Sequence, residues 1–157
     1  MTLKLIIGNK NYSSWSLRPW IAMKVAGIAF EETVISLDAE DFKAHVGPVS
    51  GTGKVPVLID NDVRVWESLA ILEYLAEKFP NAGLWPADAA ARAHARAIAN
   101  EMHAGFLPLR RHLPMNLWRP VIKRELTPEA AVNVQRIEAI WNERIARLRR
   151  CCASMSL

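Results

Sequence analysis

The sequence predicts an α/β domain, with a four-stranded mixed sheet and helices, followed by an incomplete all-α domain. Two observations predict this fold. Short β-branched strands and amphipathic helices follow one another in the order β-α-β and then β-β-α. From residue 88 onward no strand pattern occurs, and helical periods continue to the end. We therefore expect one domain over residues 1–83 and a second over residues 84–157.

The first elements form a β-α-β unit. Residues 3–7 are a continuous apolar strand, as in sheets that are covered on both faces. A helix is expected over residues 16–26, with Gly27 as its stop, and a second strand over residues 30–37. Strands joined through a helix in this way run parallel, with a right-handed crossover.

A strand pair and a further helix complete the predicted sheet. The loose segment 38–53 is expected to hold a short helix over residues 41–45. Residues 54–60 and 63–65 then give two short strands around a polar turn, which is typical of a hairpin. The apolar positions of residues 69–79 repeat with a helical period.

Two long helices are expected in the second half. One spans residues 88–113, with a kink at Pro108, and the other begins at Pro128 after a Thr127 cap. Two helices alone cannot bury both of their apolar faces. Since the chain then ends in the Arg-rich and Cys-Cys segment 144–157, we expect a truncated all-α domain.

Size and composition restrict the class of protein. The 157 residues are 51% hydrophobic, which is enough to bury a core. No apolar run approaches the roughly 20 residues of a membrane span, and residues 1–8 are too short for a signal peptide. We expect a cytoplasmic protein with no membrane partner. Cys151 and Cys152 are adjacent, and the four histidines lack metal-ligand spacing, so no disulfide framework or metal is expected.

The net charge of +4 is unevenly distributed. Residues 1–81 carry a net charge of −2 and residues 82–157 a net charge of +6. A basic half can indicate nucleic-acid binding. Here the arginines are scattered rather than striped, so we expect a solvated helical surface, or a basic wall near an anionic ligand, and no nucleic-acid partner.

Val55-Pro56 and Glu67-Ser68 form the first candidate site. A cis Val55-Pro56 bond would turn the backbone N–H and C=O of Val55 toward a molecule docked beside the strand. Glu67 and Ser68 lie at a helix N-terminus, which favours an anion. A serine hydroxyl for a carboxylate and a glutamate for an ammonium suit the α-amino-acid end of a ligand. The alternative is that either residue only caps the helix.

The loop before the first helix is the second candidate site. It follows the carboxyl end of a strand, where α/β sheets carry reactive groups, and a helix N-terminus stabilises a thiolate. Thioredoxin-like redox proteins place a Cys-x-x-Cys at this point. This chain has Ser13-x-x-Ser16 instead, which excludes dithiol chemistry. What remains is a hydroxyl that can donate to the thiolate of a ligand, or a simple helix cap.

Three stretches resemble the cytosolic glutathione S-transferase family, and most closely its serine-type bacterial members with theta- and zeta-like features. They are residues 12–20, 53–58 and 66–75, and their order and spacing carry the resemblance. The resemblance covers residues 3–85 and implies a thioredoxin-like fold there. Residues 88–148 resemble the first two helices of the family's all-α domain.

The resemblance implies a transferase with glutathione as co-substrate and a small electrophile as its second substrate. Ser13 falls where serine-type members keep the hydroxyl that bonds the glutathione sulfur, and Ser14 is the adjacent candidate. A thiol with a pKa near 8.5 needs about 2.7 kcal/mol to become mostly thiolate at pH 7. A hydroxyl supplies about 1.5–3 kcal/mol and a helix start about 0.3–1 kcal/mol, which is sufficient.

The remaining parts of glutathione are assigned by the same resemblance. Val55, before Pro56, would pair through its backbone with the cysteinyl part. Glu67 and Ser68 would hold the γ-glutamyl end, and Lys54 could reach the glycyl carboxylate.

Other functions of the same fold stay open at this point. They are a zeta-like isomerase, a non-catalytic glutathione-binding or protein-interaction module, and a truncated product with little activity. The resemblance also implies a homodimer, although the absence of the later helices would weaken it.

Overall fold

Four strands form one mixed sheet in the order β2-β1-β3-β4. The computed structural model describes residues 2–154, without the side chains of residue 144 and residues 146–154, where Cys151 and Cys152 lie. The strands are β1 (Leu3–Ile7), β2 (Phe30–Val34), β3 (Val57–Asp60) and β4 (Val63–Trp66). β1 pairs with β2 in parallel and with β3 antiparallel, and β3 pairs antiparallel with β4. The predicted β-α-β unit and hairpin are both confirmed.

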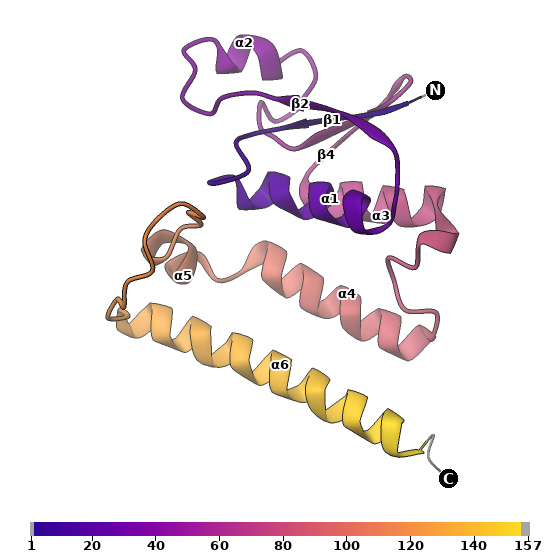
Figure 1. Cartoon of the computed structure of the whole chain (residues 1–157), viewed down its shortest axis with the longest axis vertical. Coiled ribbons are helices and arrows are strands. Elements are labelled where there is room, and N and C mark those ends of the chain that lie inside the picture. The colour runs from indigo at the N-terminus through magenta and orange to yellow at the C-terminus, as the bar shows by residue number, and fades with distance from the viewer. Residues whose placement is uncertain (1, 155–157) are drawn as a thin grey trace. The chain divides into compact units, whose positions relative to one another are not determined.

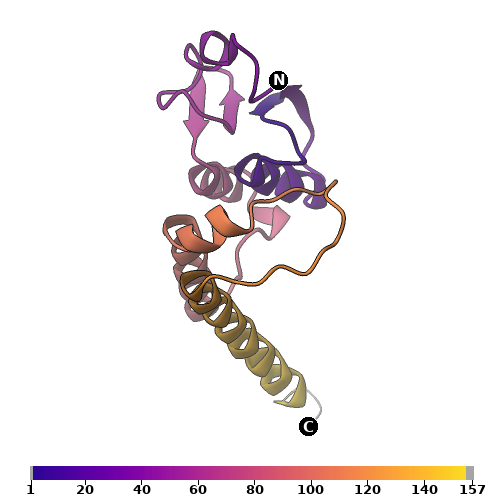
Figure 2. The same ribbon diagram turned by 90° about the vertical axis from the view of Figure 1, so that its left-hand side faces the viewer.

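Two helices pack against each other on one face of this sheet (Figures 1 and 2). They are α1 (Ser14–Val25) and α3 (Ser68–Lys78), and the short α2 (Phe42–Val46) precedes β3. α1 begins two residues before the predicted start because Ser13 caps it, and its backbone turns at Gly27 with a φ of 66°. The interior between sheet and helices is apolar and fully buried; it includes Leu5, Ile7, Met23, Leu58, Ile71 and Leu75.

Asp60 joins the hairpin to α3. Asp60 is the last residue of β3, directly before the β3–β4 turn, and is only 7% exposed. Its carboxylate accepts hydrogen bonds from the Tyr74 hydroxyl at 2.5 Å and from the Lys78 ammonium. The Lys78 and Tyr74 hydrogen bonds hold the pKa of Asp60 below its ordinary value, since they favour the ionised carboxylate. The same contacts raise the pKa values of Lys78 and Tyr74.

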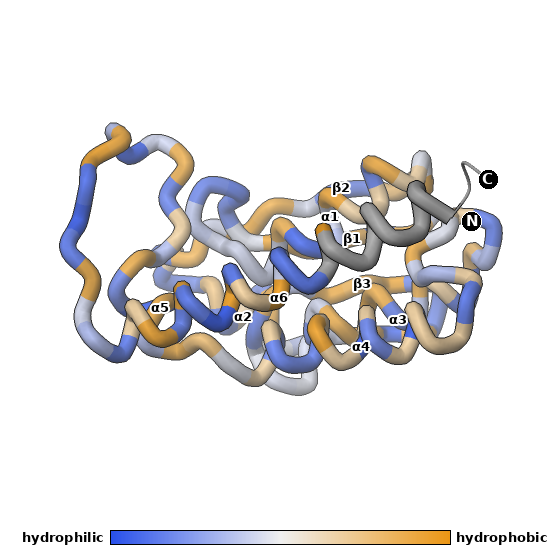
Figure 3. Tube along the Cα trace, turned by 90° about the horizontal axis from the view of Figure 1, so that it is seen from below, coloured by the Kyte–Doolittle hydropathy of each residue, from blue (hydrophilic) through white to orange (hydrophobic). Residues whose placement is uncertain are grey.

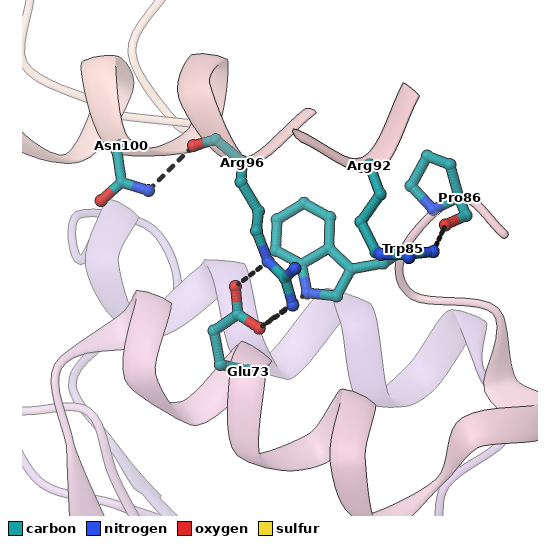
Figure 4. Close-up of polar contacts among 6 residues, drawn as sticks. All are labelled: Glu73, Trp85, Pro86, Arg92, Arg96 and Asn100. Carbon is teal, nitrogen blue, oxygen red and sulfur yellow. Dashed lines mark hydrogen bonds and ion pairs between the residues drawn. The ribbon is translucent and has the colours of Figure 1, made fainter. Parts of the chain in front are cut away.

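Glu73 joins α3 to α4 (Ala89–Ala104). Figure 4 shows the Arg96 guanidinium donating to both oxygens of the Glu73 carboxylate, at 3.0 Å each, while the Trp85 indole N–H donates to one of them, also at 3.0 Å. The Arg96 hydrogen bond lowers the pKa of Glu73. Arg92 donates to backbone carbonyls of the linker that leads into α4. These bonds fix the first part of α4 on the α/β core.

The chain divides into two compact units. The first contains the residues up to His103 together with Met115–Arg119, and the second contains Ala104–Pro114 and the residues from Pro120 on. The domain limits 1–83 and 84–157 remain a prediction. The mixed sheet and the helical second half agree with the predicted fold class.

The second unit is built from α5 (Leu107–His112) and α6 (Pro128–Ser154). Thr127 caps α6 as predicted, since its hydroxyl accepts from the Ala130 N–H at 3.2 Å. Figure 3 shows both hydrophobic and hydrophilic residues in the first part of α6. Trp141 is one of its exposed apolar side chains. Within residues 2–154, no helix is long and apolar enough to cross a membrane.

The prediction of one continuous helix over residues 88–113 with a kink at Pro108 is wrong. α4 ends at Ala104, and a new helix, α5, begins at Leu107. Phe106 between them has a φ of 62°, which no α-helix accommodates. Pro108 therefore lies in the first turn of α5, where its missing N–H removes no helical hydrogen bond.

We predict that Asp60→Asn lowers the unfolding temperature by several degrees at pH 7. Because the folded-state pKa of Asp60 is depressed, its contribution is present above about pH 4 and is lost as the pH falls through the folded value. The difference between wild type and variant should therefore shrink below about pH 4. The measurement is thermal unfolding by circular dichroism at several pH values.

Asp62→Asn, an exposed carboxylate of the same turn, is the matched control and should change little. A difference between wild type and Asp60→Asn that stays constant down to pH 2 would contradict the role of the Asp60 charge.

Candidate functional site

One edge of the sheet gathers the segments that carry both candidate sites. β1 and β4 run in the same direction, because each is antiparallel to β3. α1 follows β1 and α3 follows β4, so both helices begin at the edge where β3 starts. The topology therefore brings the start of α1, the Val55-Pro56 segment and the start of α3 to one place.

A cavity of about 200 Å³ lies at this edge. Its lining residues are Trp15, Thr52, Lys54, Val55, Pro56 and Glu67. The Val55-Pro56 peptide bond is cis, as expected. Four of the predicted site residues thus surround one cavity, and two of them, Lys54 and Glu67, bring an ammonium and a carboxylate to it. Ser13, Ser14 and Ser68 are not among the lining residues.

Glu67 has an unusual backbone at the entrance to α3. Its φ is 68° and its ψ is 126°, a region that a residue with a side chain rarely adopts. Such a conformation costs on the order of 1–3 kcal/mol and occurs preferentially at functional sites. Glu67 occupies the N-cap position, but its side chain makes no capping hydrogen bond. The carboxylate is therefore not used to cap α3.

Ser68 is the first residue of α3 and is only 1% exposed. Its hydroxyl has no hydrogen-bond partner among the described residues. A buried hydroxyl without a partner destabilises a protein, and a ligand that bonded to it would supply the missing hydrogen bond. The alternative that Ser68 is a helix cap does not hold, because the cap position belongs to Glu67.

Ser13 is the N-cap of α1 and is 9% exposed. Its Oγ accepts from the Ser16 backbone N–H at 3.4 Å, and its hydroxyl donates to Ser16 Oγ at 2.9 Å. Ser14 is the first residue of α1 and is half-buried. Both serines therefore lie at a helix N-terminus, which favours a nearby negative charge.

His103 and Trp15 are contacts of the site that the sequence pattern did not reveal. His103 Nε2 lies 3.7 Å from Glu67 Oε2, and its ring meets Trp15 edge-on with 5.1 Å between ring centres. The Arg18 guanidinium also contacts Trp15 and lies 4.3 Å from the centre of its ring. His103 is far from Glu67 and from Trp15 in the chain, so no local sequence pattern connects them. Only the folded structure could identify these two contacts.

Asn11 fixes the loop that leads to Ser13. Its side chain is buried, accepts from the Trp118 N–H at 2.9 Å and donates to the Asn116 side chain at 3.3 Å. Residues 115–119 are thereby held within the first compact unit. Among the side chains that the structure describes, no three His, Cys, Asp or Glu residues cluster as metal ligands would.

Comparison with known proteins identifies the family. A family model for the glutathione S-transferase N-terminal domain matches residues 12–78. Residues 12–78 belong to the glutathione S-transferase N-terminal domain family. A probable maleylacetoacetate isomerase from Caenorhabditis elegans is 37% identical over 97 residues, which cover 62% of this chain and 45% of that relative.

Further glutathione S-transferases are similar to this chain. A zeta-class glutathione S-transferase from Euphorbia esula is 31% identical over 121 residues, or 76% of this chain and 52% of the relative. A Burkholderia glutathione transferase homologue with bound glutathione has a TM-score of 0.60 at 29% identity, over 71% of this chain and 59% of that one. A human theta-class glutathione transferase has a TM-score of 0.62 at 29% identity, over 69% of this chain and 45% of that one. The chain spans about half the length of the curated relatives it matches.

We predict that Ser68→Ala raises the free energy of unfolding of the ligand-free protein by about 1 kcal/mol, because it removes a buried hydroxyl that lacks a partner. Ser50→Ala is the matched control. Ser50 is also buried, but its Oγ accepts from the Lys54 N–H at 3.2 Å, so its loss should destabilise by about 1 kcal/mol. Urea unfolding of both variants measures the difference. Equal destabilisation by the two substitutions would contradict the assignment.

Proposed function

We propose that this protein binds glutathione at the sheet edge described above and promotes attack of its thiolate on a small electrophile. The observation that carries the proposal is the buried Ser68 hydroxyl, which has no partner among the described residues and follows Glu67, a lining residue of the cavity, in the chain. This pair offers a donor for a carboxylate and an acceptor for an ammonium, as an α-amino-acid group requires. The bound glutathione in the Burkholderia homologue supports the same ligand.

The peptide is proposed to lie along the cavity from one end to the other. Glu67 and Ser68 hold the γ-glutamyl group. Val55, before the cis Pro56, pairs through its backbone with the cysteinyl part, and Lys54 binds the glycyl carboxylate. Lys54, Val55 and Glu67 line the same cavity, and Ser68 follows Glu67 in the chain, so one extended tripeptide is proposed to meet all of them.

Ser13 is proposed to stabilise the thiolate, with Ser14 as the neighbouring alternative. A hydroxyl that donates to a charged acceptor contributes about 1.5–3 kcal/mol, and the start of α1 adds about 0.3–1 kcal/mol. Together they lower the pKa of the glutathione thiol enough for most of it to be ionised at neutral pH. The thiol proton leaves to water, and the thiolate carries out the attack.

A glutathione-dependent isomerisation is the second candidate function. It is favoured by the similarity to probable maleylacetoacetate isomerases. The same thiolate would add to a conjugated double bond, allow rotation about the resulting single bond, and leave again. Transfer consumes glutathione and isomerisation returns it, so glutathione consumption per turnover distinguishes the two. A homodimer, the cytoplasmic location and a non-catalytic binding role remain predictions.

We predict that Ser13→Ala lowers kcat/KM for conjugation of a chromogenic aryl halide about 10- to 100-fold, through loss of one charge-assisted hydrogen bond. Glutathione affinity measured by calorimetry should fall much less, since only the sulfur contact is lost. Ser14→Ala is the matched control and should change the rate little. If the large effect belongs to Ser14→Ala instead, the hydroxyl role passes to Ser14.

We predict that Glu67→Gln weakens glutathione binding about tenfold, because the neutral amide accepts a weaker hydrogen bond from the γ-glutamyl ammonium. A glutathione analogue without the α-amino group serves as the control ligand. Wild type and variant should bind this analogue equally in calorimetric titrations. An equal loss for both ligands would show that the substitution disturbs the cavity rather than one contact.

A further inference from the structure

Ser16 links the candidate sulfur-binding serine to the end of β1. It lies in the first turn of α1 and is fully buried. Its Oγ accepts two hydrogen bonds, one from the Gly8 backbone N–H at 3.0 Å and one from the Ser13 hydroxyl at 2.9 Å. A hydroxyl oxygen has two lone pairs, so Ser16 Oγ is fully used as an acceptor.

The backbone of Gly8 lies close to the side chains of Leu37 and Ser13. A Cβ on Gly8 would lie 2.7 Å from Leu37 Cδ2 and 3.3 Å from Ser13 Cβ. The absence of a side chain therefore lets the Gly8 N–H reach Ser16 while the Ser13 loop passes beside it. Gly8, Ser16 and Ser13 form one buried hydrogen-bonded chain at the start of α1.

In this arrangement the Ser13 proton is engaged within the protein. It can bond a ligand sulfur only by turning away from Ser16 Oγ. The Ser16 hydroxyl carries a proton of its own, and Ser13 Oγ lies within hydrogen-bond distance of it. Hydroxyl protons rotate freely about the C–O bond, so the same 2.9 Å contact can serve with either oxygen as donor.

We propose that Ser16 is a positioning residue that reverses its hydrogen bond with Ser13 when glutathione binds. The Ser13 proton turns to the thiolate, and the Ser16 proton turns to Ser13 Oγ. The chain then runs from the Gly8 N–H through the Ser16 hydroxyl and the Ser13 hydroxyl to the sulfur. No covalent bond of the protein changes, and the thiol proton leaves to water.

This reversal strengthens the thiolate contact for two reasons. Ser13 keeps its bond to Ser16 instead of exchanging it for the bond to sulfur. In addition, each donor in the chain polarises the next, which makes the Ser13 hydroxyl a better donor. The inference rests on the proposed function, since it assigns the sulfur to Ser13.

The test is the pKa of the thiol of bound glutathione, followed by ultraviolet absorbance of the thiolate against pH in the full chain. Wild type is compared with Ser13→Ala, Ser16→Ala and Ser16→Cys. Cysteine keeps nearly the size of serine and is a weaker donor and acceptor, so it decides the test if Ser16→Ala does not fold. The affinity for S-methylglutathione, which has no thiol, is measured for each variant.

We expect the bound thiol pKa to rise by about one unit in Ser16→Ala, a tenfold lower ratio of thiolate to thiol, and by a smaller amount in Ser16→Cys. The affinity for S-methylglutathione should stay within about twofold of wild type, because the proposed chain acts only on the thiolate. A purely structural role of Ser16 would raise the thiol pKa and lower the affinity for S-methylglutathione together.

Two results would overturn the inference. One is an unchanged thiol pKa in the Ser16 variants while Ser13→Ala raises it, which would leave the role of Ser13 intact. The other is a parallel loss of S-methylglutathione affinity. If Ser13→Ala itself leaves the thiol pKa unchanged, the proposed role of Ser13 fails, and the role of Ser16 fails with it.

Discussion

The pairing of β3 with both β1 and β4 is the constraint on which the site depends. Because β3 is antiparallel to each neighbour, β1 and β4 point the same way, and the helices that follow them start at the same sheet edge. Two helix N-termini then face the segment that enters β3. Their unpaired N–H groups and dipoles make this edge favourable for an anionic ligand.

α3 combines a strained start with firm anchors along its length. At the start, Glu67 has a positive φ and Ser68 buries an unpartnered hydroxyl. Further on, Glu73 is bound by Arg96, and Asp60 accepts from two side chains of the last turns. A helix held in this way at its middle and end can keep an unfavourable backbone where a ligand is to bind. Stability lost at one end is thus offset by contacts elsewhere on the same helix.

The apolar patterns predicted the sheet and most helices, since a strand that is buried on both faces and an amphipathic helix leave distinct periods. The prediction was wrong over residues 88–113. The apolar pattern there stays helical through Gly105 and Phe106, so the sequence predicted a kink at Pro108 instead. In the structure Phe106 takes the positive φ and the proline starts the next helix. Local propensity could not decide between these two places, because a proline fits both a kink and a first turn.

The sequence by itself determined the strands, the hairpin turn and the Thr127 cap. It also determined the candidate site residues Ser13, Ser14 and the Glu67-Ser68 pair. Each of these is written in neighbouring residues, where pattern and propensity act. Only the tertiary structure decided that Ser68 lacks a partner among the residues it describes, that Ser13 bonds to Ser16 and through it to Gly8, and that His103 approaches Glu67. Hydrogen-bond satisfaction depends on which distant groups meet in the folded chain, and no local pattern records that.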